Sequence, residues 1–176
     1  MTCFEIKTNR LVLKPMCMDY LESTHEYASD PGNCTYMLYL PNETIDMTRR
    51  FIERAETEWR LDQPAFYELA VLLGGKHIGG VSLSPEDGGT SAELGWIINR
   101  RYHNRGYASE AAAALMEYAA SHLGIKRFIA HCDTENKPSE RIMIKLGMTK
   151  TAEYGGRRSR NFDHERREYL YERTYL

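Results

Sequence analysis

The sequence predicts a single α+β domain in which strands and helices are mixed along the whole chain. Segments with apolar residues at every second position, typical of half-buried strands, lie among segments with apolar residues three and four apart, typical of helices. The 176 residues suit one hydrophobic core. No internal repeat, low-complexity stretch or Pro/Gly/Ser linker divides them, so we expect one domain over residues 1–176.

The N-terminal third predicts one strand and two helices. The alternation from Phe4 to Pro15 predicts the strand. Asp19 is placed to cap a short helix that runs to about Ser29, and Thr44 is placed to cap a longer helix over residues 45–61. The expected inner face of the longer helix consists of Phe51, Ile52, Ala55 and Trp59.

The middle of the chain predicts an antiparallel meander followed by a crossover. Residues 65–73, 76–83 and 91–98 have strand patterns and are separated by turn-forming residues. A helix over about residues 106–123 then leads to a buried strand over residues 127–132, which we expect to run parallel to its predecessor. The expected inner stripe of this helix is Ala111, Leu115, Tyr118, Ala119 and His122.

The C-terminal part predicts one more helix and a closing pair of strands. The helix runs from about Pro138 to Leu146, because proline suits the first turn and Gly147 can end it. Residues 148–153 and 163–175 have strand patterns.

The composition argues against nucleic-acid, membrane and metal partners. A net charge of −2 provides no basic field for nucleic acid. No apolar run has the length of a membrane span, and the N-terminus lacks the layout of a signal peptide, so a cytoplasmic location is expected. The cysteines form no CxxC pair and no zinc-spaced cluster, so we expect no metal and free thiols at Cys3, Cys17, Cys34 and Cys132.

The segment from Leu94 to Ala111 carries the candidate chemistry, because a strand runs into a short basic loop and a glycine, Gly106, opens the following helix. A helix N-terminus leaves N–H groups unpaired and carries partial positive charge, which suits phosphates. The loop is not a P-loop, since GxxxxGK[ST] is missing, and it is not a dinucleotide fingerprint, since GxGxxG is missing. The basic residues Arg100, Arg101 and Arg105 can add charge-assisted hydrogen bonds, or they can simply face solvent.

Three segments together resemble the GNAT N-acetyltransferases, and in particular their ribosomal-protein N-terminal (Rim-type) branch. Residues 103–111, HNRGYASEA, resemble the pyrophosphate loop (Q/R)-x-x-G-x-(G/A), with His103 in place of the usual Gln or Arg. Residues 136–148 resemble the signature NxxSxxxxxKLGF, and residues 8–15 resemble a first strand TxRLxLRP. The resemblance implies a mixed, mostly antiparallel central sheet with helices on both faces and a splayed pair of parallel strands.

The same resemblance implies acetyl-CoA as the donor, held between the two splayed strands. Its pantetheine arm would pair with the backbone of Trp96, Ile97 and Ile98. Asn136 would hydrogen-bond this arm or a nearby water, although a capping role is the alternative. The pyrophosphate would lie on the loop formed by His103, Asn104, Arg105, Gly106, Tyr107, Ala108 and Ser109.

The implied reaction is the direct attack of an amine on the thioester. An alkyl amine is mostly protonated at neutral pH, so a base must accept its proton. We favour Glu93 as this base and place Glu68 second and His131 third, although each can be an ordinary strand residue. An N–H group near Ile98 is the candidate donor to the oxyanion.

Ser139 is the implied proton donor to the leaving thiolate. Met143 stands where many relatives have a tyrosine for this task, and methionine cannot donate a proton. Tyr67 and Trp96 are candidates to line an acceptor pocket or to be core residues, and residues 155–167 are expected to rim its entrance.

The sequence thus predicts an acetyl-CoA-dependent N-acetyltransferase that acts on a primary amine, either a protein N-terminus or a small molecule. One alternative is a non-catalytic module that senses acyl-CoA. Another is a nucleic-acid-binding domain that uses the loop arginines, which the net charge disfavours. A homodimer is common in families of this type.

Overall fold

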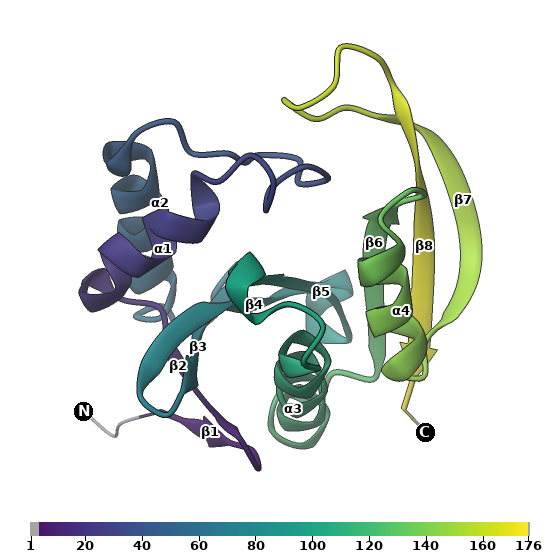
Figure 1. Ribbon diagram of the computed structural model, residues 1–176. Coiled ribbons are helices and arrows are strands. Elements are labelled where there is room, and N and C mark those ends of the chain that lie inside the picture. The colour runs from purple at the N-terminus through teal and green to yellow at the C-terminus, as the bar shows by residue number, and fades with distance from the viewer. Residues whose placement is uncertain (1–3, 176) are drawn as a thin grey trace.

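The computed structural model describes residues 4–175 and confirms the α+β class with a mostly antiparallel sheet (Figure 1). Within this range the 8-stranded sheet has the order β1-β2-β3-β4-β5-β6-β8-β7. All neighbours are antiparallel except β5 and β6. The strands are β1 (Ile6–Lys7), β2 (Leu11–Pro15), β3 (Tyr67–Leu73), β4 (Lys76–Glu86), β5 (Ser91–Ile98), β6 (Arg127–Asp133), β7 (Thr149–Arg157) and β8 (Arg166–Thr174).

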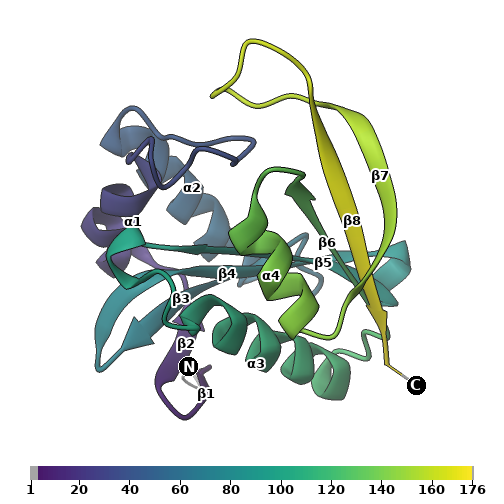
Figure 2. The same cartoon turned by 45° about the vertical axis from the view of Figure 1, so that its right-hand side comes forward.

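Helices cover both faces of the sheet, as predicted. The α-helices are α1 (Leu21–Ala28), α2 (Ile45–Glu58), α3 (Tyr107–His122) and α4 (Lys137–Lys145). Alternate residues of β3 separate the two packing layers, because Leu69 and Val71 join the core that includes α3, whereas Ala70 packs with Ile52 and Ala55 of α2. Figure 2 shows α3 below the sheet and α1 and α2 above it.

The N-terminal segment is a hairpin, so the prediction of one strand from Phe4 to Pro15 is wrong. β1 and β2 pair with each other around a turn that begins at Thr8. The Thr8 hydroxyl accepts a hydrogen bond from the Leu11 amide at 2.9 Å, and the Thr8 amide donates to the Leu11 carbonyl at 2.9 Å. Alternation alone does not reveal such a turn, because polar and apolar residues continue to alternate on either side of it.

The helix starts differ in how well the sequence predicted them. Thr44 caps α2 as expected, since its hydroxyl accepts from the Met47 amide at 3.4 Å. Asp19 does not cap α1. It lies inside a 3-10 turn, η1 (Met18–Tyr20), that leads directly into the helix, and Tyr20 is the cap residue.

Two residues expected on inner helix faces are exposed. Phe51 lies beside the buried Ile52 but points outward, where it lines a cleft. His122, at the end of α3, is exposed and stacks on the Tyr118 ring at a centroid distance of 4.4 Å. Ala111, Leu115 and Ala119 are buried as predicted.

The parallel strands β5 and β6 part soon after they begin. They pair only at Ser91/Arg127, Ala92/Phe128 and Glu93/Ile129. Beyond this point β5 stays with β4 as far as Ile98, whereas β6 stays with β8 as far as Asp133. The predicted splayed pair is therefore present.

The remaining expectations concern thiols and membranes. Cys17, Cys34 and Cys132 are free, and Cys3 lies outside the described residues. Between residues 4 and 175, no helix is both long enough and apolar enough to cross a bilayer.

Candidate active site

A cleft of about 1090 Å³ opens where β5 and β6 part. From Leu94 onward, the edge of β5 that faces β6 has no strand partner within residues 4–175. An open strand edge can hydrogen-bond an extended ligand in the manner of an added strand. Trp96, Ile97 and Ile98 all line the cleft, so the predicted pantetheine residues lie at this edge.

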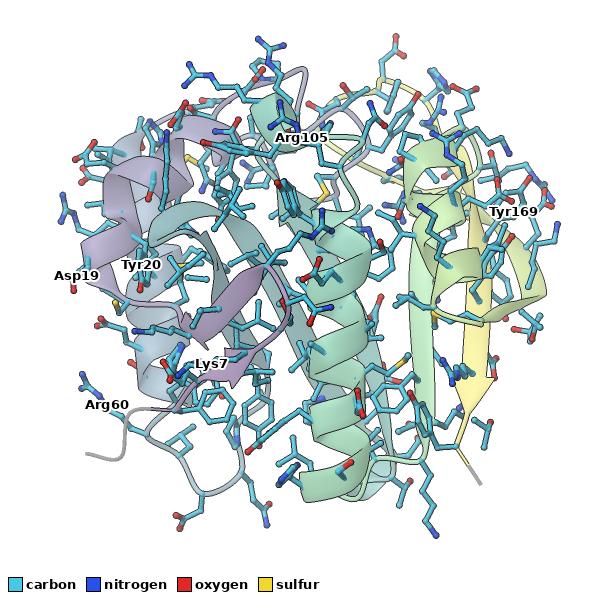
Figure 3. The ribbon with its side chains drawn as sticks, turned by 60° about the horizontal axis from the view of Figure 1, so that its bottom comes forward. Lys7, Asp19, Tyr20, Arg60, Arg105 and Tyr169 are labelled. Carbon is cyan, nitrogen blue, oxygen red and sulfur yellow. The ribbon has the colours of Figure 1, made fainter. Side chains whose placement is uncertain are left out.

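The loop that joins β5 to α3 presents unpaired N–H groups to the same cleft. Asn104 and Gly106 have φ of 60° and 80°, and the loop turns through them into α3. The amides of residues 104–109 donate no hydrogen bond to any residue from 4 to 175. His103 supports the loop, since its Nε2 lies 2.7 Å from the Ile98 carbonyl oxygen. Figure 3 shows Arg105 at this N-terminal end of α3.

Two of the three loop arginines have structural partners instead of facing the cleft. Arg100 pairs with Asp30 at 2.7 Å, and Arg101 pairs with Glu26 at 2.6 Å. These ion pairs tie the loop to α1 and to the segment that follows it. The expectation that Arg100 and Arg101 contribute directly to phosphate binding is therefore not supported by their geometry.

Glu68 lies on the floor of the cleft. The strand register aligns Glu68 with Ser82 and Gly95 across β3, β4 and β5, so their Cβ positions share one face. Burial, which leaves the residue 9% exposed, raises the pKa of the Glu68 carboxyl to about 8. Gly80 makes room for this carboxyl, since a Cβ at Gly80 would lie 2.6 Å from Glu68 Oε1.

Glu93, the favoured candidate base, forms a pair with His131. Glu93 is the last residue of β5 that pairs with β6, and its Oε1 lies 2.9 Å from Nδ1 of His131, two residues beyond the last paired residue of β6. This hydrogen bond raises the pKa of His131 and favours its charged form. Glu93 and His131 both line the cleft, so the structure brings all three candidate bases to one cavity.

Helix α4 contributes Asn136 and Ser139 to the cleft wall. Asn136 caps α4, because its Oδ1 accepts from the Ser139 amide at 3.2 Å, so the capping alternative is correct for this oxygen. Met143 is fully buried in the core and does not line the cleft. The Met143 side chain therefore does not reach the cleft, whereas the neighbouring Ile142 lines it.

Of the two aromatic residues considered for an acceptor pocket, Trp96 lines the cleft, whereas Tyr67 packs against the core, which was its alternative. Tyr67 contacts Trp59 and lines a small separate cavity next to α3, so it does not line the cleft. Tyr27, Tyr36 and Phe66 also line the cleft. Tyr27 and Tyr36 could not be identified from the sequence pattern, because Tyr27 lies in α1 and Tyr36 lies in an irregular loop.

Two basic residues that the sequence analysis did not identify also line the cleft. Arg141 and Lys145 lie one helical turn apart on α4, and neither has an acidic partner among the described residues. Their spacing of four residues in the sequence was the available signal.

A roof over the cleft joins two segments that are far apart in the sequence. We define the roof as residues 33–40 together with residues 157–166. The Asn161 side-chain amide donates to the carbonyls of Cys34, Leu40 and Met37 at 2.8, 3.1 and 3.5 Å. Arg157 donates to the Tyr36 carbonyl at 3.0 Å. Within residues 155–167, which we expected to rim the entrance, Arg157 lines the cleft.

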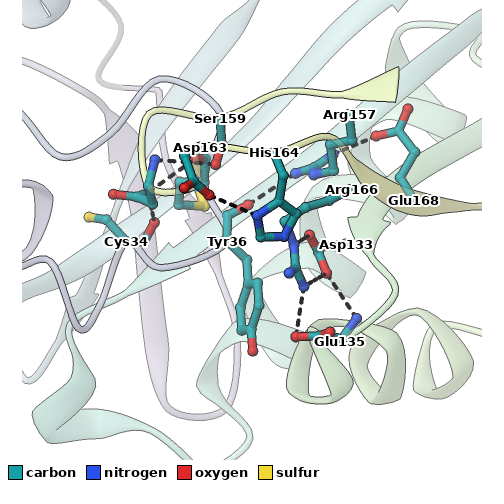
Figure 4. A network of polar contacts seen from close by, with 12 residues as sticks. Cys34, Tyr36, Asp133, Glu135, Arg157, Ser159, Asp163, His164, Arg166 and Glu168 are labelled. Carbon is teal, nitrogen blue, oxygen red and sulfur yellow. Dashed lines mark hydrogen bonds and ion pairs between the residues drawn. The ribbon is translucent and has the colours of Figure 1, made fainter. Parts of the chain in front are cut away.

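The roof is also tied to the end of β6 (Figure 4). Arg166 donates to both carboxylate oxygens of Asp133, at 2.5 and 2.8 Å, and lies over the Phe162 ring at 4.1 Å. Burial acts to raise the pKa of Asp133, but the hydrogen bonds from Arg166 and the Glu135 amide, together with the charges of Arg166 and Arg157, hold this pKa below its ordinary value. The charged pair thus fixes the roof relative to a splayed strand.

Comparison with known proteins gives a consistent match. The family model described as "Acetyltransferase (GNAT) domain" matches residues 10–149. The uncharacterized N-acetyltransferase YnaD of Bacillus subtilis is 32% identical over 145 residues, which cover 81% of each chain.

Solved structures share the fold. A GNAT-family acetyltransferase from Bacillus anthracis superposes with a TM-score of 0.81 at 29% identity, covering 97% of this chain and 98% of that one. RimL, a ribosomal L7/L12 α-N-protein acetyltransferase solved with coenzyme A, has a TM-score of 0.83 at 17% identity, covering 97% and 98%. At that identity the likeness concerns the fold alone.

Replacing Asn161 with Asp tests the roof. A carboxylate cannot donate to the carbonyls of Cys34, Met37 and Leu40, so we expect Asn161→Asp to release residues 33–40 and lower the free energy of unfolding by about 1–3 kcal/mol. Chemical unfolding and hydrogen exchange of residues 33–40 measure the two effects. Asn9→Asp, at an exposed turn, is the matched control. Unchanged exchange in Asn161→Asp would show that the roof does not depend on this amide.

Proposed function

The chain belongs to the GNAT acetyltransferase family, and we propose that it transfers an acetyl group from acetyl-CoA to a primary amine by direct attack. The observation that carries this proposal is the single cleft that combines an unpaired strand edge, unpaired loop amides and a buried carboxyl. Each of these features matches one demand of the reaction.

The donor would lie between the splayed strands. The β5 edge at Trp96, Ile97 and Ile98 suits the amide groups of a pantetheine arm, and the amides of residues 104–109 suit a pyrophosphate. Asn136 still has its side-chain N–H groups available to the cleft, because only its oxygen is used in capping α4.

We assign Glu68, in preference to Glu93, as the base that accepts the proton of the attacking amine. A general base works best when its pKa lies near the operating pH, and burial brings the pKa of Glu68 to about 8. Glu93 is already engaged with His131, so it would first have to leave an ion pair. The Glu93–His131 pair instead holds the two strands together at the point where they part.

The remaining steps are the formation of the C–N bond, the stabilisation of the oxyanion and the release of the thiolate. A C–N bond forms as the amine proton passes to Glu68, and an unpaired N–H of β5 near Ile98 stabilises the oxyanion. When the C–S bond breaks, the thiolate takes a proton from the Ser139 hydroxyl, and Ser139 takes one from solvent at the same time, so that no alkoxide remains. Glu68 then releases the amine proton to solvent. The alternative of a non-catalytic acyl-CoA sensor rested on Met143, which has no proton to donate. We favour the active enzyme because Ser139, which has a hydroxyl proton, lines the cleft.

We further assign the chain to the Rim-type branch, because residues 8–15, 103–111 and 136–148 together carry motifs like those of that branch. Its acceptor is accordingly a primary amine of a protein N-terminus or of a small molecule. The RimL structure, which was solved with coenzyme A, supports this assignment at the level of the fold.

Thermal unfolding with and without millimolar acetyl-CoA tests the donor. At about a hundred times the dissociation constant, binding adds about 2.7 kcal/mol, which raises the Tm of a chain of this size by roughly 5–10 °C. Gly106→Pro should abolish the rise, because proline removes the N–H group and cannot adopt a φ of 80°. Gly124→Pro, with similar strain at the other end of α3, should retain the rise. A parent protein without a rise would overturn the proposed donor.

The pH dependence of stability tests the state of Glu68. Its pKa of about 8 in the folded protein exceeds that of an exposed carboxyl, so the unfolded chain loses its proton first as the pH rises. The parent should therefore lose several kcal/mol of stability between about pH 4.5 and pH 8, and Glu68→Gln should remove this loss. Chemical unfolding at pH 5 and pH 8 measures it. Equal pH dependence in both proteins would contradict a raised pKa.

Gly80→Ala tests the position of the base without removing it. The new methyl group would displace the Glu68 carboxyl, whereas its other neighbours lie at 3.6 Å, so the fold should persist. We expect kcat with an accepted amine to fall about a hundredfold while acetyl-CoA affinity is retained. Gly155→Ala, which meets nothing within 4 Å, is the control. A parental kcat in Gly80→Ala would exclude Glu68 as the base.

A further inference from the structure

The turn between β1 and β2 contacts the first turn of α3 through a cluster of three side chains, which we call the clasp: Thr8, Arg10 and Glu110. The Thr8 hydroxyl donates to Glu110 Oε1 at 2.6 Å. The Arg10 side chain places Nε 2.7 Å and Nη2 2.6 Å from Glu110 Oε2, and the Arg10 amide donates to Oε1 at 3.0 Å. Both carboxylate oxygens are therefore held, in a contact that spans about a hundred residues of sequence.

Arg10 also reaches the loop whose amides face the cleft. Its Nη1 donates to the Arg105 carbonyl at 2.9 Å, and its guanidinium lies over the Tyr107 ring at 4.6 Å. Between these two residues, a Cβ at Gly106 would lie 3.4 Å from Arg10 Nη2. One side chain thus contacts both sides of the glycine that opens α3.

The contact with Arg105 has a directional consequence. In a trans peptide the carbonyl and the following N–H point in opposite directions. When Arg10 holds the Arg105 carbonyl, the Gly106 N–H is directed away from Arg10. That N–H makes no hydrogen bond to a described residue, and Gly106 lines the cleft.

The clasp also neutralises the negative charge of Glu110 near the phosphate-binding loop. Glu110 is an acidic residue in the first turn of α3, close to where phosphates would lie. Burial acts to raise the pKa of Glu110, but the hydrogen bonds from Thr8 and Arg10 lower it below its ordinary value, so the carboxyl is ionised. Pairing with Arg10 offsets the repulsion that this charge would exert on a phosphate.

We propose that the clasp positions the phosphate-binding loop, and that Arg10 is a positioning residue for coenzyme A that itself lies behind the loop. This inference rests on the proposed function, because it assumes that the loop binds the donor. It gives residues 8–10 of the first hairpin a role in the site that alternation of the strand pattern did not suggest.

Calorimetric titration with coenzyme A tests the proposal in Arg10→Met, Arg10→Lys and Glu110→Gln. Each loss of a charged hydrogen bond should raise the Kd for coenzyme A about tenfold to a hundredfold. Lysine retains the charge near Glu110 but cannot also hold the Arg105 carbonyl. Arg10→Lys should therefore have a Tm close to that of the parent protein, whereas its affinity for coenzyme A should stay as low as that of Arg10→Met. This split separates positioning from a merely structural role.

Arg127→Met is the matched control. Arg127 pairs with Glu172 at 2.9 Å, and the side chains of this pair are 42% and 22% exposed, against 45% and 18% for Arg10 and Glu110. This control should lose a similar amount of stability and bind coenzyme A like the parent. If Arg10→Met bound coenzyme A with parental affinity, or if the control bound it as weakly as Arg10→Met, the proposed role of the clasp would be wrong. A parent that does not bind coenzyme A would overturn the proposed function and the clasp together.

Discussion

Strands β5 and β6 hydrogen-bond each other only between Ser91 and Glu93 on β5, and then each follows a different neighbour. This parting determines the rest of the site. It leaves a strand edge without a partner in an otherwise continuous sheet, and backbone groups at such an edge need hydrogen bonds from water or a ligand. It also brings the N-terminal end of α3 and the cap of α4 to the two sides of one opening.

The floor of the cleft depends on small residues as much as on charged ones. Gly80 and Gly95 leave the space that Glu68 Oε1 and Ser82 Oγ occupy, because a Cβ at either glycine would lie within 2.6 Å of them. As a result the Glu68 carboxyl is buried where its charged form is disfavoured. Burial of such a group costs free energy and does nothing to stabilise the sheet. A carboxyl with a raised pKa inside a cleft is a candidate for proton transfer, which is the role that we propose for Glu68.

The sequence predicted the features that depend on local pattern. The meander, the crossover and the glycine at the start of α3 are visible as alternation, spacing and a single breaker residue. The predictions from the sequence were wrong where contacts between distant parts of the chain determine the role of a side chain. Arg100 and Arg101 were candidate phosphate ligands, but the structure pairs them with Asp30 and Glu26. Phe51 lines the cleft, although its spacing predicted a position on the inner face of α2. Glu68 ranked below Glu93 because burial, which raises its pKa, cannot be seen in a linear pattern.

The central claim is that the open edge of β5 and the loop amides bind one ligand together. The most direct measurement is an amide NMR titration of the whole chain with coenzyme A. We expect the largest shifts to occur together at residues 94–98 and 104–109, with the same binding curve. Shifts confined to other surfaces, or two groups that titrate with different affinities, would contradict a single donor site at the parting of β5 and β6.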